Sequence, residues 1–209
     1  MADDLIFDLR NFSVKPFRTL LFYKYVHIEN AEQFAAAHLQ WCITQGLKGR
    51  VLVAEEGLNG TISGTIDQTQ AYMDHLHSDP RFADMVFKVD EEDEVSFAKM
   101  HVRHKHEIVR FGVEEVNVWK HSGKYLEPEE WLKVKDEPDT VVIDFRNEVE
   151  WEVGKFKNAV TLPITHFRDV PQHLGVLQQY KDKKILAYCT GGIRCEKATA
   201  FLIENGVKE

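Results

Sequence analysis

Residues 184–202, KILAYCTGGIRCEKATAFL, decide the fold of the C-terminal half of this 209-residue chain. The apolar run 184–188 predicts a buried strand, and residues 196–202 predict the opening turns of a helix. Cys189 therefore lies between a strand end and a helix start, where backbone N–H groups are unpaired and the helix dipole is positive. Such a setting lowers the pKa of a thiol, so we expect Cys189 to be a reactive thiolate and a nucleophile.

The loop that follows this cysteine is suited to holding negative charge. Its two glycines allow the backbone to curl into an anion-binding nest, and Arg194 adds a fixed positive charge. We expect Arg194 and the loop amides to stabilise charge on the sulfur or on a substrate. The loop residues are Thr190, Gly191, Gly192 and Ile193. Cys195 is either a resolving thiol for an oxidised Cys189 or a small packed residue at the helix start.

A second continuous apolar run, residues 140–144, predicts a strand that is buried on both faces, as in a parallel sheet covered by helices. The C-terminal half is therefore expected to be α/β, with its site at the carboxyl ends of the strands. Asp144 and Arg146 follow this strand. An ion pair that supports the loop is their favoured interpretation, and direct catalysis is the alternative.

The N-terminal half shows a different order of elements. We expect strands at 17–28, 50–54, 61–66 and 85–89 and helices at 31–45 and 68–76, with a hairpin turn at Asn59-Gly60. The order βαββαβ predicts a ferredoxin-like sandwich. Gly123 and Pro128 interrupt the chain beyond it. The expected division is an extension at 1–16, a ferredoxin-like domain at 17–112 and an α/β domain at 113–209.

Composition narrows the class of protein. Three cysteines are too few for a disulfide framework and fit a reducing compartment. The acidic N-terminus lacks the features of a signal peptide, and no window approaches the length of a membrane span. We therefore expect a cytoplasmic protein without a membrane partner.

A basic segment stands out against the net charge of −8. In residues 99–105, KMHVRHK, every odd position is positive or titratable, so a strand would present these side chains on one face. Such a stripe neutralises phosphates or is simply a solvated surface. The residues considered for RNA contact are Lys99, Arg103, Lys105, Arg110 and Asn59. The histidine spacing fits no standard metal site, and we expect no metal.

The spacing from Cys189 to Arg194 is C-x4-R, one residue shorter than the C-x5-R loop of protein tyrosine phosphatases. The tighter ring suits a single sulfur atom and resembles the loop of the rhodanese domain. Residues 144–146, DFR, and 152–159, EVGKFKNA, resemble the rhodanese motifs D-x-R and E-x-x-G-H-I-x-G-A. The chain departs from the second motif at Lys155, Phe156 and Asn158.

A narrower resemblance combines residues 54–64, 105–110 and 189–197. Together they resemble the bacterial oxygen-dependent tRNA uridine hydroxylases, from about residue 17 to the chain end. This resemblance implies tRNA as partner, molecular oxygen as co-substrate with no other cofactor evident, and conversion of the wobble uridine at position 34 to 5-hydroxyuridine. It implies an acylphosphatase-like, ferredoxin-like first domain and a rhodanese-like second domain whose cysteine carries a persulfide. It also implies a tail beyond Glu209, so we expect an incomplete rhodanese-like domain.

Two other classes remain open. A sulfurtransferase would move sulfane sulfur from a sulfur donor through a persulfide on Cys189 to an acceptor, and the loop chemistry by itself favours it. A non-catalytic RNA-binding module with a vestigial loop is the third class. The intact Cys189 and Arg194 argue against the module.

Overall fold

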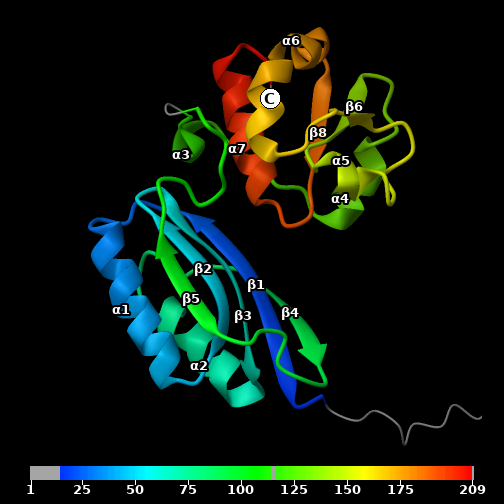
Figure 1. Ribbon diagram of the computed structural model, residues 1–209. Helices are drawn as coiled ribbons and strands as arrows, with labels where there is room; N and C mark the ends of the chain where they lie inside the picture. Colours follow the sequence, from blue (N-terminus) through cyan, green and yellow to red (C-terminus); the bar gives the residue numbers. More distant parts are fainter. Residues whose placement is uncertain (1–14, 114–115, 209) are drawn as a thin grey trace, which may run out of the picture.

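The N-terminal half of the chain is a mixed five-stranded sheet with two helices on one face (Figure 1). The computed structural model describes residues 15–113 and 116–208. The strand order is β4-β1-β3-β2-β5, and only the β2–β5 pair is parallel. The elements are β1 (Phe17–Tyr25), α1 (Ala31–Thr44), β2 (Lys48–Ala54), β3 (Gly57–Thr65), α2 (Ile66–His77), β4 (Phe87–Glu92) and β5 (Met100–His104). The expected ferredoxin-like order is confirmed, with β5 added at the edge beside β2.

Alternation along β1 divides the sheet into a covered face and an open face. Leu20 and Phe22 are buried and pack with Tyr72 of α2 in the N-terminal core. Successive side chains of a strand point to opposite faces. Tyr23 and Tyr25 therefore lie on the face that the two helices leave uncovered.

The prediction of a hairpin turn at Asn59-Gly60 is wrong, because both residues lie inside β3. Residues 55–56 form the turn instead. The glycines serve close packing within the strand instead. A Cβ on Gly60 would lie 2.8 Å from the Phe22 ring and 2.9 Å from a methyl of Val51. Gly57 has φ +149°, and a Cβ there would approach the Lys24 carbonyl oxygen to 2.1 Å. These positions accept only glycine in this geometry.

The C-terminal half contains a three-stranded parallel sheet in the order β7-β6-β8. Its elements are α3 (Val118–His121), α4 (Pro128–Val134), β6 (Thr140–Asp144), α5 (Glu148–Trp151), β7 (Val160–Thr161), the 3₁₀ helix η2 (Phe167–His173), α6 (Leu174–Leu177), the 3₁₀ helix η3 (Gln178–Tyr180), β8 (Lys184–Tyr188) and α7 (Ile193–Glu204). Ile143 packs with Phe201 of α7 on one side of the sheet, whereas Val142 and Leu186 pack with Trp131 of α4 on the other. Burial of the sheet on both faces is confirmed.

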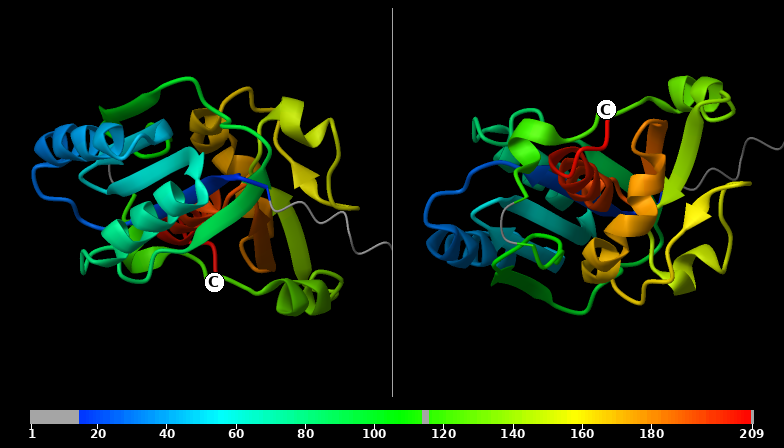
Figure 2. Two further views of the ribbon diagram at one scale, coloured as in Figure 1. Left: turned by 90° about the horizontal axis from the view of Figure 1, so that it is seen from below. Right: turned by 90° about the horizontal axis from the view of Figure 1, so that it is seen from above.

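The two domains lie one above the other, with α7 next to the N-terminal sheet (Figures 1 and 2). The Lys197 ammonium of α7 is 2 % exposed and bonds Glu56 at 2.9 Å and Glu107 at 2.8 Å. Phe111, which follows these carboxylates in the chain, is buried in the C-terminal core. No helix in residues 15–113 and 116–208 is long and apolar enough to cross a membrane.

Candidate active site

Cys189 directly follows β8, and α7 begins at Ile193, three residues earlier than the sequence predicts. Gly192 precedes the helix with φ +101°, a conformation that glycine tolerates, and its N–H donates to the Cys189 Sγ at 3.1 Å. The pKa of Cys189 is lowered to about 5 by the Cys195 thiol, then by backbone N–H groups and the charge of Arg194, against the opposing effect of burial. The nucleophile expected at this position is therefore a thiolate at neutral pH.

Cys195 acts on that thiolate more strongly than the helix terminus does. Its thiol hydrogen-bonds Cys189, and this bond, together with burial and the charge on Cys189, raises the pKa of Cys195. Both cysteines are free thiols. If Cys189 is oxidised to a sulfenic acid, a neighbouring thiol can condense with it to form a disulfide and release water. The resolving role of Cys195 stays a prediction.

Arg194 is fixed by a carboxylate that sequence analysis missed. Its guanidinium bonds both oxygens of Glu150, at 2.7 and 2.8 Å, and the Thr190 hydroxyl at 2.8 Å. Thr190 in turn donates to Glu150 at 2.7 Å. These bonds, that of Arg194 first, lower the pKa of Glu150 to about 2. Glu150 thus holds Arg194 and the loop in a fixed geometry, and it offsets part of the positive charge that faces Cys189.

The ion pair expected at the end of β6 is present. The Arg146 guanidinium lies 2.7 Å from Asp144, which is fully buried, and it also donates to the Gly154 carbonyl at 2.7 Å. The Tyr188 hydroxyl donates to the same Asp144 carboxylate, one residue before Cys189. The network therefore links both strand ends beneath the loop. Neither Asp144 nor Arg146 lines the cavity described next.

A cavity of about 1200 Å³ lies between the two domains, and Cys189 is part of its wall. Other walls come from β1, from residues 122–127 and from Trp131 of α4. Two tyrosines of β1 reach the loop: Tyr23 donates to Glu196 at 2.7 Å, and Tyr25 donates to the Ile193 carbonyl at 3.1 Å. The N-terminal domain thus contributes side chains directly to the Cys189 site.

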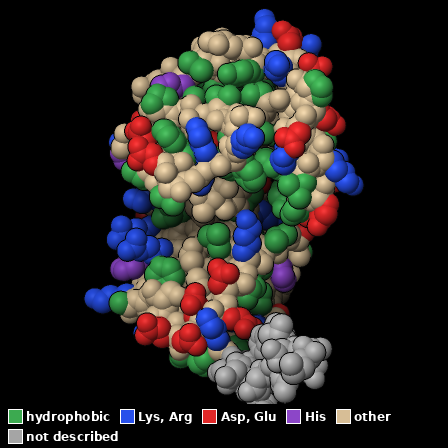
Figure 3. All heavy atoms as spheres, turned by 90° about the vertical axis from the view of Figure 1, so that its right-hand side faces the viewer, with side chains coloured by type: hydrophobic (Ala, Val, Ile, Leu, Met, Phe, Trp, Pro, Cys, Tyr) green, Lys and Arg blue, Asp and Glu red, His purple; other side chains and the backbone are tan. Residues whose placement is uncertain are grey.

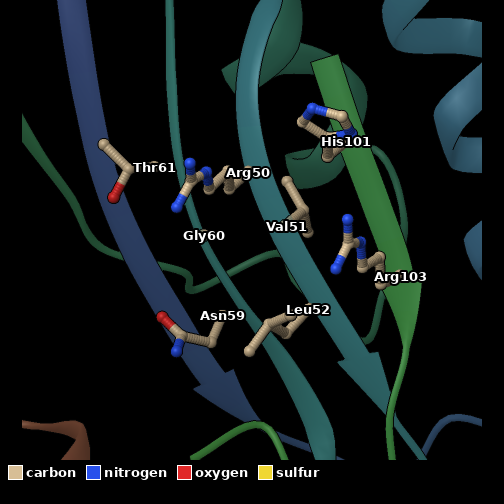
Figure 4. A pocket seen from close by; sticks show the side chains of 8 residues that line it. All are labelled: Arg50, Val51, Leu52, Asn59, Gly60, Thr61, His101 and Arg103. Atoms are coloured by element: carbon tan, nitrogen blue, oxygen red, sulfur yellow. The ribbon is translucent and has the colours of Figure 1, made fainter. Parts of the chain in front are cut away.

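A second hollow, of about 510 Å³, lies on the open face of the N-terminal sheet (Figure 4). Arg50 of β2 and His101 and Arg103 of β5 lie over it, with Asn59 and Thr61 of β3 beside them. We call this the basic groove. Neither arginine forms an ion pair within residues 15–113 and 116–208. Figure 3 shows Lys and Arg side chains gathered at the waist of the molecule, where the two domains meet.

The structure groups only some of the residues considered for RNA contact. Arg103 and Asn59 both line the basic groove. Lys99 and Lys105 are exposed at either end of β5, where their backbones bond β2. Arg110 is exposed farther along, next to the segment that holds Lys197. Alternation along residues 99–105 was the sequence signal for Arg103. Arg50 was missed, because β2 and β5, which bring the two arginines to one face, are far apart in the sequence.

Comparisons with known proteins agree with this two-part architecture. Residues 17–108 match the "UPF0176 acylphosphatase like domain", and residues 127–209 match the "Rhodanese-like domain". Three proteins named "tRNA uridine(34) hydroxylase" are close relatives. That of Bacillus licheniformis is 49 % identical over 92 % of this chain and 61 % of its own length. That of Streptococcus thermophilus is 48 % identical over 93 % and 62 %, and that of Streptococcus pyogenes is 46 % identical over 92 % and 61 %.

The chain thus spans about three fifths of the length of these relatives. Within that span it carries both domains in order, with the Cys189 loop between β8 and α7. The chain thus carries a UPF0176 acylphosphatase-like domain followed by a rhodanese-like domain, and over nine tenths of its length it is similar to proteins named tRNA uridine(34) hydroxylase.

Proposed function

We propose that this protein hydroxylates uridine 34 of tRNA to 5-hydroxyuridine in the cytoplasm, with molecular oxygen as co-substrate and Cys189 as nucleophile. One observation carries the proposal: the Cys189 thiolate opens into a cavity of about 1200 Å³ that the two domains form together. A rhodanese acting on a small sulfur compound needs no second domain in its wall. A base presented by a large RNA needs both a pocket and a surface for its backbone.

The chemistry that fits a thiolate here is addition to the uracil ring. The Cys189 sulfur forms a bond to C6, and the C5=C6 electron pair moves toward C5 and the O4 carbonyl, giving an enolate. A proton on that enolate neutralises it, and loss of the proton with expulsion of the thiolate restores the ring. This reversible step is redox-neutral, and it makes C5 the electron-rich carbon at which hydroxylation occurs.

The decisive experiment is nucleoside mass spectrometry of tRNA. A strain lacking the gene should lose 5-hydroxyuridine and its derivatives. The wild-type gene should restore them, and Cys189→Ser should not. A tRNA with 5-fluorouridine at position 34 should form a covalent adduct with the wild-type enzyme only. Unchanged tRNA nucleosides in the deletion strain would refute the proposal.

We propose that the basic groove holds tRNA phosphates. Arg50 and Arg103 have no carboxylate partner in the described ranges, so they are available to a polyanion. Asn59 adds a polar group on the same face, and Lys99, Lys105 and Arg110 extend the positive surface. Binding through phosphates releases counterions, so the affinity for tRNA should fall steeply with salt.

The test of the groove is a charge reversal. Arg50→Glu with Arg103→Glu should weaken tRNA binding and lower the slope of log Kd against log salt by about 1 for each lost phosphate contact. Lys133→Glu with Lys135→Glu, at the C-terminal end of α4, is the matched control. Equal salt slopes for the two double variants would exclude the groove as the phosphate site.

The second candidate is sulfurtransfer, favoured by the C-x4-R loop and the low pKa of Cys189. A persulfide on Cys189 would pass its outer sulfur to an acceptor such as cyanide, after receiving it from a sulfur donor. Robust, Cys189-dependent transfer from thiosulfate to cyanide, together with loss of a thio-modified nucleoside in the deletion strain, would favour this candidate.

A further inference from the structure

The carboxyl group of Glu196 lies in the Cys189 site, and neither the loop motif nor the proposed chemistry so far gives it a part. Glu196 stands one helical turn after Gly192, its N–H bonded to the Gly192 carbonyl at 3.2 Å. It lines the same cavity as Cys189 and Cys195. Of these three groups it alone is bonded to a side chain of the other domain, through the Tyr23 hydroxyl.

The Tyr23 hydroxyl lies directly against the Cys189 loop. A Cβ on Gly192 would lie 2.6 Å from the Tyr23 Oη, so the hydroxyl occupies the space that the glycine leaves open. The same hydroxyl donates to Glu196 Oε1 at 2.7 Å. A single contact with the N-terminal domain therefore sets both the surface over the loop and the orientation of the carboxyl.

The surroundings of Glu196 raise the pKa of its carboxyl group. Burial and then the charge of Cys189 raise the pKa of Glu196, against the Tyr23 hydrogen bond, which lowers it. Cys189 and Tyr23 face it across the cavity, and Tyr25 lies near it on β1. On its own helix, Arg194 is bonded to Glu150. No Lys or Arg side chain bonds Glu196 in the part of the chain that the structure describes.

The pKa of the Cys189 thiol is lowered and that of the neighbouring Glu196 carboxyl is raised. Such opposite shifts within one site indicate that the first group is the nucleophile and the second the acid–base group. We propose that Glu196 is the acid–base residue of the Cys189 site, giving a proton to the bound uracil and taking it back, and that Tyr23 of the N-terminal domain is its positioning residue. The inference rests on the proposed function. When the Cys189 sulfur bonds C6, the Glu196 proton moves to the enolate oxygen at O4, and the carboxylate left behind accepts the Tyr23 hydrogen bond. The reverse transfer releases the adduct.

The first test is Glu196→Gln, which keeps the volume and an acceptor for Tyr23 but removes the titrating proton. The rate of adduct formation with 5-fluorouridine tRNA in a single turnover should fall by about a hundredfold or more. The thermal midpoint of unfolding and the Kd for tRNA should stay at their wild-type values, because docking of the domains is retained. Glu152→Gln, exposed on the same domain, is the matched control. A single-turnover rate within about threefold of wild type would overturn the inference.

The second test needs no tRNA and so separates this inference from the proposed function. The rate of Cys189 alkylation by iodoacetamide, followed against pH, should show two inflections in the wild type, one for the thiolate and one for Glu196. Glu196→Gln should abolish the second. Two identical profiles would refute the acid–base pair even if hydroxylation is established, and a lost inflection would support it even if tRNA is not hydroxylated.

The positioning role of Tyr23 is tested by comparing two tyrosines on one strand. Tyr23→Phe keeps the ring over Gly192 but removes the bond to Glu196, so the second inflection should move to higher pH. Tyr25→Phe removes a bond to the Ile193 carbonyl of the same loop and should leave that inflection in place. An equal shift in both variants would mean that the loop is merely loosened, and it would overturn the role assigned to Tyr23.

Discussion

The thiolate of Cys189 depends on neighbours that belong to one helical turn. The largest influence on its pKa is the Cys195 thiol, and the Gly192 N–H and the Arg194 charge add to it. Arg194 is itself held by two hydrogen bonds to Glu150. The two residues that follow Arg194 in α7 thus supply a hydrogen-bond donor and a carboxyl to the same cavity.

The role of Cys195 predicts a specific change in pH dependence. Below the pKa of about 5, Cys189 is protonated, so the inflection that belongs to the thiolate in the pH profile of its alkylation by iodoacetamide should have its midpoint near pH 5. Cys195→Ala removes the thiol donor and should move the midpoint upward, toward the ordinary value for cysteine. Cys195→Ser keeps a donor and should move it less. Peptide mass spectrometry separates Cys189 from Cys42, which is buried and has a pKa raised to about 12. A midpoint near 5 in Cys195→Ala would contradict this account.

At the scale of single elements, the strands are read from sequence more securely than the turns are. The continuous apolar runs of β6 and β8 predict a sheet buried on both faces, because each alternate set of side chains has a core to enter. The Asn59-Gly60 pair fails as a turn signal, since Gly60 is required by the Phe22 ring across the strand pair. A glycine that forms a turn and a glycine that is needed for close packing cannot be distinguished in the sequence.

The packing at β3 leads to a stability prediction. In Gly60→Ala the added methyl would meet the Phe22 ring and Val51 at less than 3.0 Å, so strand or core must shift. We expect a loss of about 1–3 kcal/mol in the free energy of unfolding, measured by urea denaturation. Gly154→Ala, where a Cβ meets nothing within 4 Å, should change the free energy by less than about 0.5 kcal/mol. Equal stability of the two variants would show that β3 accommodates the methyl.

For the molecule as a whole, the link between the domains is polar and buried. Lys197 of α7 is 2 % exposed and bonds two carboxylates of the N-terminal half, Glu56 and Glu107. Glu56 also accepts the Ile108 N–H at 2.8 Å, and Glu107 accepts the Phe111 N–H at 3.1 Å. The same two carboxylates therefore anchor both α7 and the segment at residues 108–111 that leads from one domain to the other.

Removing one partner from this network should be costly. Lys197→Met leaves two carboxylates facing an apolar side chain, and we expect a loss of about 3–5 kcal/mol in the free energy of unfolding. The triple change Lys197→Met, Glu56→Gln and Glu107→Gln removes all three charges and should recover part of that loss. Limited proteolysis should cut Lys197→Met faster than wild type between the domains. Wild-type resistance to the protease in Lys197→Met would argue that apolar contacts alone hold the domains together.

Contacts between the domains are what sequence reasoning could not reach. The Cys189 loop with Arg194 and the Asp144–Arg146 pair could be predicted, because each is a short contiguous segment whose glycines or charged residues indicate its role. Tyr23 and Glu196 are 173 positions apart, and no periodicity in either segment indicates that they meet. Lys197 in turn has the pattern of a surface residue on a helix. The packing of the two domains against each other, rather than their secondary structure, determines the partners of Tyr23, Glu196 and Lys197.

The Tyr23–Glu196 contact has a consequence for how such a two-domain protein is inherited and rebuilt. If a carboxyl beside the cysteine is oriented by a hydroxyl from the other half, neither half is a complete module. Grafting the C-terminal domain onto a different N-terminal domain would transfer the thiolate but not its companion group. A recombinant chimera would have to carry the middle of β1 along with α7, and selection would act on the two segments as a single unit.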